Sequence, residues 1–303
     1  MTCRLLGTVS ALVLGATSAL AETTLPCRQP QMAASGNAVY VTCGTPTSIL
    51  VARSEDGGRT FAPAETVATV AALSLGMHRG PRIVALGDTL VLSAIAGEVG
   101  GGKDGDLLAW RSTDGGRHWS KPARVNDVPA AAREGLHAMA AHGRTVAATW
   151  LDLRASGTSL VVAVSEDGGA HWGPNVVAYR SPSGTICQCC HPSLAVDASG
   201  PISAMFRNDR DGARDMYVIG SADGGRTWTN GEKLGQGTWP LKACPDGWRR
   251  ARPRFAWRDR HDVAARSDGL PVFAGDCRDR RRRRRESDAR DHADWTTGSM
   301  ERR

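Results

Sequence analysis

One eight-residue pattern occurs four times in the chain and constrains its fold more than any other feature. The copies begin at Ser54, Ser112, Ser165 and Ser221, so their starts are 58, 53 and 56 residues apart. Each copy reads Ser-x-Asp-Gly-Gly-x-x-Trp, with Phe61 in place of Trp in the first copy. Repetition at this period is typical of proteins built from one supersecondary unit that is used several times.

Apolar runs of strand length precede every copy. The runs directly before the copies are residues 49–52, 107–110, 160–164 and 216–219, and further runs lie upstream at 38–42, 89–95, 145–150 and 201–206. The Asp-Gly-Gly sequence predicts a tight turn, because Asp accepts backbone amides and the glycines supply positive φ. We therefore expect four-stranded antiparallel units. Their structural turn residues are Asp56, Asp114, Asp167 and Asp223.

The repeated pattern resembles the Asp box of the sialidase (neuraminidase) and BNR-repeat superfamily. The resemblance implies an all-β fold: a sialidase-like β-propeller, six-bladed in the family, with the Asp boxes on the rim away from the active site. It covers residues 22–245, which supply about four blades. Six blades would need on the order of 330 residues. The propeller is thus expected to be incomplete, unless the remaining strands come from the C-terminal tail.

The N-terminus differs from the repeated part. An apolar run over residues 5–20 follows Arg4 and contains the small-x-small sequence Ala19-Leu20-Ala21. This pattern predicts a cleavable signal peptide over residues 1–21 and an exported protein, secreted or periplasmic. No later run is long and apolar enough to span a bilayer, so no membrane span is expected.

The positive charge of the chain belongs to its C-terminal end. Residues 1–245 contain 21 Lys and Arg against 20 Asp and Glu, whereas residues 246–303 contain 17 Arg, no Lys and 11 acids. No nucleic-acid partner is therefore expected for the repeated part. The tail, 246–303, is predicted to be disordered or read in a shifted frame, because it lacks alternating apolar runs. Its six arginines, 280–285, would form a polyanion-binding arm only if the tail is native.

Seven cysteines remain once Cys3 leaves with the signal peptide, an odd number that leaves one thiol over, and six of them fall into two groups. Cys27 and Cys43 bracket the first predicted strand and form a plausible disulfide, since exported cysteines usually pair. The other disulfide candidates are Cys187, Cys189, Cys190 and Cys244. Three thiolates and His191 could alternatively bind Zn²⁺ or Cu(I), but the spacing favours disulfides and no metal. No nucleotide fingerprint is present, so no cofactor is expected.

The resemblance also implies site residues. Sialidases of this fold hold the substrate carboxylate with three arginines and use an Asp as acid/base. Arg79, in the segment 78–81, matches the first arginine, and Arg207, at the end of a predicted strand, resembles a second. Asp104, on a glycine-rich loop, matches the acid/base. For each residue the alternative is an ordinary surface charge. The scattered histidines are expected at the surface or in turns: His78, His118, His137, His142 and His171.

The tyrosines leave the activity open. The family places its nucleophilic Tyr in the last blades, whereas the tyrosines here are Tyr40, Tyr179 and Tyr217. Two functions therefore fit: an exo-α-sialidase-type glycoside hydrolase acting on sialylated or other glycans, and a non-catalytic propeller that binds a glycan or a protein. A glycan substrate or ligand is the expected partner, and a protein is the alternative for the non-catalytic propeller.

Overall fold

The computed structural model describes residues 27–240 of the 303-residue chain. The predictions for residues 1–21, for residues 246–303 and for Cys244 lie outside the described residues. Every regular secondary-structure element in the described part is a β-strand, as the repeat predicts. No segment of this part is a helix that could cross a membrane.

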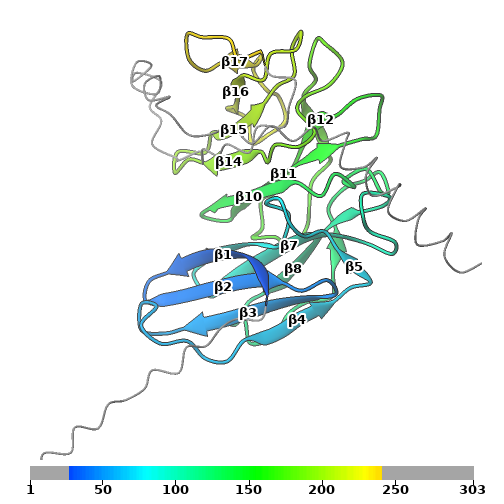
Figure 1. Cartoon of the computed structure of the whole chain (residues 1–303). Helices are drawn as coiled ribbons and strands as arrows, with labels where there is room; N and C mark the ends of the chain where they lie inside the picture. Colours follow the sequence, from blue (N-terminus) through cyan, green and yellow to red (C-terminus); the bar gives the residue numbers. More distant parts are fainter. Residues whose placement is uncertain (1–26, 241–303) are drawn as a thin grey trace, which may run out of the picture.

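The strands form four antiparallel sheets, one around each copy of the repeat (Figure 1). Blade 1 contains β1 (Arg28–Ser35), β2 (Ala38–Gly44), β3 (Ser48–Ser54) and β4 (Glu65–Thr69). Blade 2 contains β5 (Ala72–Leu73), β6 (Arg82–Leu86), β7 (Thr89–Gly97), β8 (Asp106–Ser112) and β9 (Ala123–Arg124), with β5 and β6 both paired to β7. Blade 3 contains β10 (His137–His142), β11 (Thr145–Asp152), β12 (Ser159–Ser165) and β13 (Val176–Tyr179). Blade 4 contains β14 (Ser193–Val196), β15 (Ile202–Arg207), β16 (Met216–Ser221) and β17 (Glu232–Lys233).

The sheets follow one another as the blades of a propeller. From blade to blade the inner strand packs against its counterpart: β1 contacts β6, β6 contacts β10, and β10 contacts β14. Inner strands that contact one another in the order of the blades are arranged around a central axis, as in a propeller. The predicted all-β propeller with about four blades is confirmed for residues 27–240.

The apolar core lies in three layers, each between two neighbouring blades. Leu90 belongs to the layer between blades 1 and 2, Trp150 to the layer between blades 2 and 3, and Phe206 to the layer between blades 3 and 4. Nearly every residue of β7 and β11 is buried, because both faces of these strands pack against side chains. Blade-to-blade packing therefore supplies most of the apolar burial that stabilises the fold.

Hydrogen bonds inside each Asp box explain its residue types, as the second box shows. The Ser112 hydroxyl donates to Asp114 Oδ1 (2.7 Å) and accepts from the Gly116 amide (2.9 Å). Asp114 Oδ1 also accepts the amides of Arg117 and His118 at 3.0 Å each. These bonds, those from His118 first, hold the pKa of Asp114 well below its usual range. The same serine-to-aspartate bond is present in the other boxes, at Asp56, Asp167 and Asp223.

Strand pairing places the Asp boxes and the predicted site residues at opposite ends of the blades. In blade 4, Ile202 pairs with Ser221, which begins an Asp box, whereas Arg207 lies at the other end of β15. We call the end with the boxes the Asp-box face and the other end the loop face. Arg79 and Asp104 lie on the loop face with Arg207. That face is formed by residues 45–47, 74–81, 98–105, 130–136, 153–158, 180–192 and 208–215.

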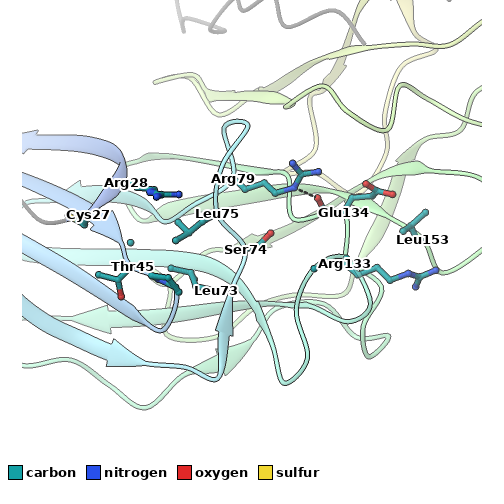
Figure 2. A pocket seen from close by; sticks show the side chains of 14 residues that line it. Cys27, Arg28, Thr45, Leu73, Ser74, Leu75, Arg79, Arg133, Glu134 and Leu153 are labelled. Atoms are coloured by element: carbon teal, nitrogen blue, oxygen red, sulfur yellow. Dashed lines mark hydrogen bonds between the residues drawn. The ribbon is translucent and has the colours of Figure 1, made fainter. Parts of the chain in front are cut away.

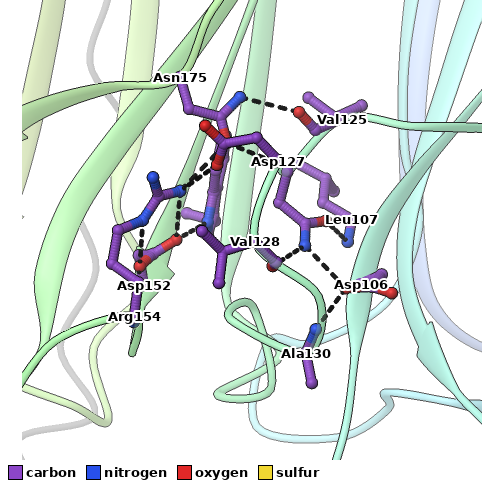
Figure 3. A network of polar contacts seen from close by, with 11 residues as sticks. Asp106, Leu107, Val125, Asp127, Val128, Ala130, Asp152, Arg154 and Asn175 are labelled. Carbon is purple, nitrogen blue, oxygen red and sulfur yellow. Dashed lines mark hydrogen bonds and ion pairs between the residues drawn. The ribbon is translucent and has the colours of Figure 1, made fainter.

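An ion pair between a buried carboxylate and a partly buried arginine holds the segment that follows β11. Asp152 is fully buried and accepts two hydrogen bonds from the Arg154 guanidinium, at 2.8 Å from Nε and 3.0 Å from Nη2 (Figure 3). The Trp150 indole donates a third at 2.8 Å. Arg154 also contacts Asp127 at 2.9 Å and Asn175 at 3.1 Å. The network therefore joins β11 to the segments before β10 and before β13.

Candidate functional site

A cleft of about 750 Å³ opens on the loop face, between segments of blades 1, 2 and 3 (Figure 2). Three arginines line it: Arg28 at the start of β1, Arg79 before β6, and Arg133 before β10. Thr45 and Ser74 add hydroxyl groups. A concave site with a few polar groups brought together from separate segments is typical of ligand binding.

Arg79 joins two blades at this cleft. Its Nε donates a hydrogen bond of 2.6 Å to the backbone carbonyl of Glu134, as Figure 2 shows. The preceding residue, His78, has a φ of 66°, a left-handed conformation that is uncommon for a residue with a side chain. Such strain persists only where the surrounding structure holds it, and it clusters at functional segments. The segment before β6 is therefore shaped to hold Arg79 at the cleft.

Three residues of the cleft were not predicted from the sequence: Arg28, Arg133 and Glu134. A signal was available for two of them, since Arg133-Glu134-Gly135 precedes β10 much as Arg79-Gly80 precedes β6. Both arginines thus occupy the segment before the inner strand of a blade. Glu134 is the one carboxylate among the described residues that line the cleft.

Replacing Gly135 with alanine is expected to distort the cleft and destabilise the protein by roughly 2–4 kcal/mol. Gly135 has a φ of +77°, and an added Cβ would lie 2.0 Å from Ser74 Oγ and 2.8 Å from Arg79 Cδ. Gly143→Ala is the matched control, because Gly143 has a φ of +58° with nothing within 4 Å. Its expected loss is about 1 kcal/mol. Urea unfolding compares the two variants, and equal losses would contradict the predicted overlap.

Asp104, the predicted acid/base, braces its own loop. Its carboxylate accepts the backbone amides of Glu98, Val99 and Gly100 at 2.7, 2.9 and 2.6 Å. These bonds, that from Val99 first, lower the pKa of Asp104, whereas a general acid at neutral pH needs a raised one. The loop that Asp104 holds contributes residues 101–102 to the cleft. A part in proton transfer stays a prediction.

Arg207 lies on the loop face but is not among the residues that line the cleft. Its side chain is buried, and its Nη1 donates to the carbonyl of Arg214 at 2.5 Å. The guanidinium carbon lies 5.0 Å from the centre of a Trp239 ring, a cation–π distance. The structure thus brings Arg79 into the cleft and not Arg207, whose binding of a substrate carboxylate stays a prediction.

Four polar residues meet near the inner strands, and of these Arg82, Ser93 and His137 are buried and His191 is half-buried. Arg82 donates to His191 Nε2, at 3.2 Å from Nε and 2.5 Å from Nη2, and Ser93 Oγ lies 3.0 Å from His137 Nε2. Because a guanidinium has donors only, His191 Nε2 accepts and its ring is neutral. Burial lowers the pKa of both histidines, and the charge of Arg82 lowers it further. The expectation of a surface or turn position is wrong for His137, because it begins the enclosed strand β10.

The free energy of unfolding is expected to fall as the pH drops below about 6.5, the ordinary histidine pKa. His137 and His191 have lower pKa values in the folded protein than in the unfolded chain, so the unfolded chain binds protons first. Each histidine then removes up to about 1.4 kcal/mol per pH unit, until the pH reaches its folded pKa. Urea unfolding between about pH 7.5 and 5.5 measures the slope.

His137→Gln is the variant that tests this assignment. It is expected to flatten the dependence of stability on pH, because one of the two histidines with a lowered pKa is gone. His142→Gln, at an exposed histidine, should leave the dependence unchanged. A slope that is the same in His137→Gln and the unaltered protein would contradict the assignment.

The cysteines form one pair and one cluster among the described residues. Cys27 and Cys43 form the predicted disulfide. Cys187 and Cys190 are buried with their sulfurs 3.3 Å apart, and Cys189 is disulfide-bonded. The hydrogen bond with Cys190 lowers the pKa of the Cys187 thiol to about 6. The three sulfurs lie within 4.8 Å of one another, and the choice between disulfides and a metal at this cluster stays a prediction.

All three tyrosines of the chain are described, and none lines the cleft. Tyr40 and Tyr217 are buried in the layers between blades. The hydroxyl of Tyr179 accepts a hydrogen bond of 3.0 Å from Asn208 Nδ2. The loop-face cleft therefore offers a carboxylate, at Glu134, but no phenol as a nucleophile.

Comparison with known proteins gives one family and a set of similar folds. Residues 47–237, more than half of the chain, match the BNR repeat-like domain family. No curated protein matches the chain.

Three solved structures illustrate the similarity, each over about 70% of this chain. The leech intramolecular trans-sialidase is 11% identical with a TM-score of 0.48, and this chain covers 51% of its length. The intramolecular trans-sialidase of Ruminococcus gnavus is 13% identical with a TM-score of 0.46, covered over 70%. The α-L-arabinanase of Penicillium chrysogenum is 17% identical with a TM-score of 0.46, covered over 65%.

Proposed function

Because the chain belongs to the BNR repeat-like domain family, we propose that it is a sialidase-like propeller whose loop-face cleft binds an acidic glycan. One observation carries the proposal: Arg28, Arg79 and Arg133 line the same cleft, although they come from three different blades. A guanidinium offers paired donors in a fixed plane, which suits a sugar carboxylate. Thr45 and Ser74 supply hydroxyl groups that suit the hydroxyls of a sugar.

The residues that line the loop-face cleft favour binding of the glycan without hydrolysis. Retaining hydrolysis needs a nucleophile and an acid/base on either side of the glycosidic bond, and Glu134 is the one acidic residue among the described lining residues. Hydrolysis is the second candidate, because the Glu134 carboxylate lies in the cleft and could stabilise the positive charge that develops on the sugar in an oxocarbenium-like transition state.

Two assays separate these functions. In saccharide-observed NMR with the full-length protein, N-acetylneuraminic acid is expected to bind, whereas its neutral methyl ester and galactose are not. Equal binding of acid and ester would overturn the carboxylate proposal. A fluorogenic sialoside is expected to stay intact, and turnover that is lost in Glu134→Gln would establish hydrolysis instead.

We also propose that the protein acts outside the cytoplasm. The apolar run of residues 5–20 and the Cys27–Cys43 disulfide support this location, because disulfides persist in oxidising compartments. N-terminal sequencing of protein recovered from the periplasm or medium tests it. The expected first residue is Glu22, and an intact Met1 would contradict the proposal.

A further inference from the structure

The junctions between neighbouring Asp boxes are not equivalent. Where blade 1 meets blade 2, Arg117 of the second box lies 3.5 Å from Glu55 of the first. Where blade 3 meets blade 4, Arg226 pairs with Glu166 at 3.1 Å. In both pairs the arginine is the sixth residue of its box, and the glutamate is the second residue of the preceding box. Two of the three junctions are therefore bridged in the same way.

The junction between blades 2 and 3 cannot form this bridge. The residues at the equivalent positions are Thr113 and Ala170. A second cleft, of about 460 Å³, opens at this junction, and both residues line it. The short side chains leave space where the other junctions hold an ion pair. This cleft lies on the Asp-box face, at the end of the blades opposite the loop-face cleft.

The lining of the second cleft carries net positive charge. Arg111 and Lys121 line it, and among residues 27–240 neither is in an ion pair. Arg111 Nε donates to the carbonyl of Gly168 at 2.9 Å, which holds the guanidinium between two blades. The one carboxylate of the lining, Asp114, accepts bonds from its own box, including one of 2.6 Å with His118 Nδ1.

An aromatic ring completes the lining. Trp119 is half-buried, and its Nε1 donates to the carbonyl of Gly116 at 3.1 Å, which fixes the orientation of the indole. Apolar rings beside a few placed charges are typical of small-ligand sites. We propose that this cleft binds an anionic saccharide, with Arg111 and Lys121 holding its sulfate or carboxylate and Trp119 packing against the sugar ring. The proposal does not depend on the function of the loop-face cleft.

Closing the cleft tests the proposal. Thr113→Glu/Ala170→Arg installs the bridge of the other junctions and should weaken binding about tenfold or more, because the new side chains fill the space that the ligand needs. Lys121→Met should weaken it by a similar factor without altering the junction. Arg59→Met is the matched control, because it removes one charge from the same face at the first box.

The probes are N-acetylglucosamine 6-sulfate, glucuronic acid and neutral N-acetylglucosamine, titrated at low salt into the full-length protein. The indole N–H resonance of Trp119 reports binding at this cleft. We expect an anionic probe to shift it and the neutral probe not to, and the stronger anionic probe identifies the group bound. Arg79→Met should leave the shift unchanged, which separates this cleft from the loop face. No shift with either anionic probe, or unchanged binding in both cleft variants, would overturn the proposal.

Discussion

Replacing Arg154 with methionine is expected to lower the free energy of unfolding by about 3–5 kcal/mol. The substitution leaves the buried Asp152 carboxylate without the guanidinium that donates to both of its oxygens. A buried charge that loses its partner costs more than the intact pair contributes, because water cannot solvate it. Urea unfolding at neutral pH measures the loss.

Two variants show whether the loss arises from the unpaired charge. Arg117→Met breaks the exposed pair with Glu55 and is expected to cost less than about 1 kcal/mol. Asp152→Asn/Arg154→Met removes both charges of the pair and is expected to recover part of the stability. Arg154→Met that is as stable as Arg117→Met would contradict the structural role of the network.

Replacing Arg79 with methionine is expected to weaken binding of N-acetylneuraminic acid roughly 30- to 100-fold, the effect of losing a charged, paired donor. Methionine keeps the apolar length of the side chain but removes the guanidinium from the cleft. It also removes the hydrogen bond to the Glu134 carbonyl. NMR titration gives the affinity, and unfolding measured in parallel shows how much stability this bond contributes.

Arg79→Lys is the conservative control for this variant. Lysine keeps the charge without the planar pair of donors, so an intermediate affinity is expected. Arg117→Met, on the Asp-box face, should bind as the unaltered protein does. Unchanged affinity in Arg79→Met, with the protein folded, would show that the acid binds elsewhere.

The fold could be predicted from the sequence because its determinants are local. Each Asp box forms its turn from residues within eight positions, as the bonds from Ser112 to Asp114 and Gly116 show. The distance in sequence between successive boxes is long enough for the strands of one blade, so each repeat forms one blade. The number of blades followed directly, since each box accounts for one sheet.

The site could be predicted only in part, because it depends on contacts between blades. Arg79 was identified through a motif, whereas Arg28 and Arg133 reach the same cleft from sequence positions about fifty residues away. Burial of His137 likewise follows from the packing of β10 against β6 and β14, which no local pattern encodes. Asp104 differs from these residues, because its hydrogen bonds reach only backbone amides within six residues of it in the sequence. These local bonds hold its own loop in place.

Chemical-shift mapping with N-acetylneuraminic acid tests most directly whether the loop face carries the ligand site. Gly101 and Gly102 line the loop-face cleft, whereas Gly57 and Gly58 belong to the first Asp box. Glycine amides appear in a separate region of the spectrum and report both faces in one titration. We expect saturable shifts at Gly101 and Gly102 with none at Gly57 and Gly58. Binding that leaves the cleft glycines unshifted would contradict a ligand site on the loop face.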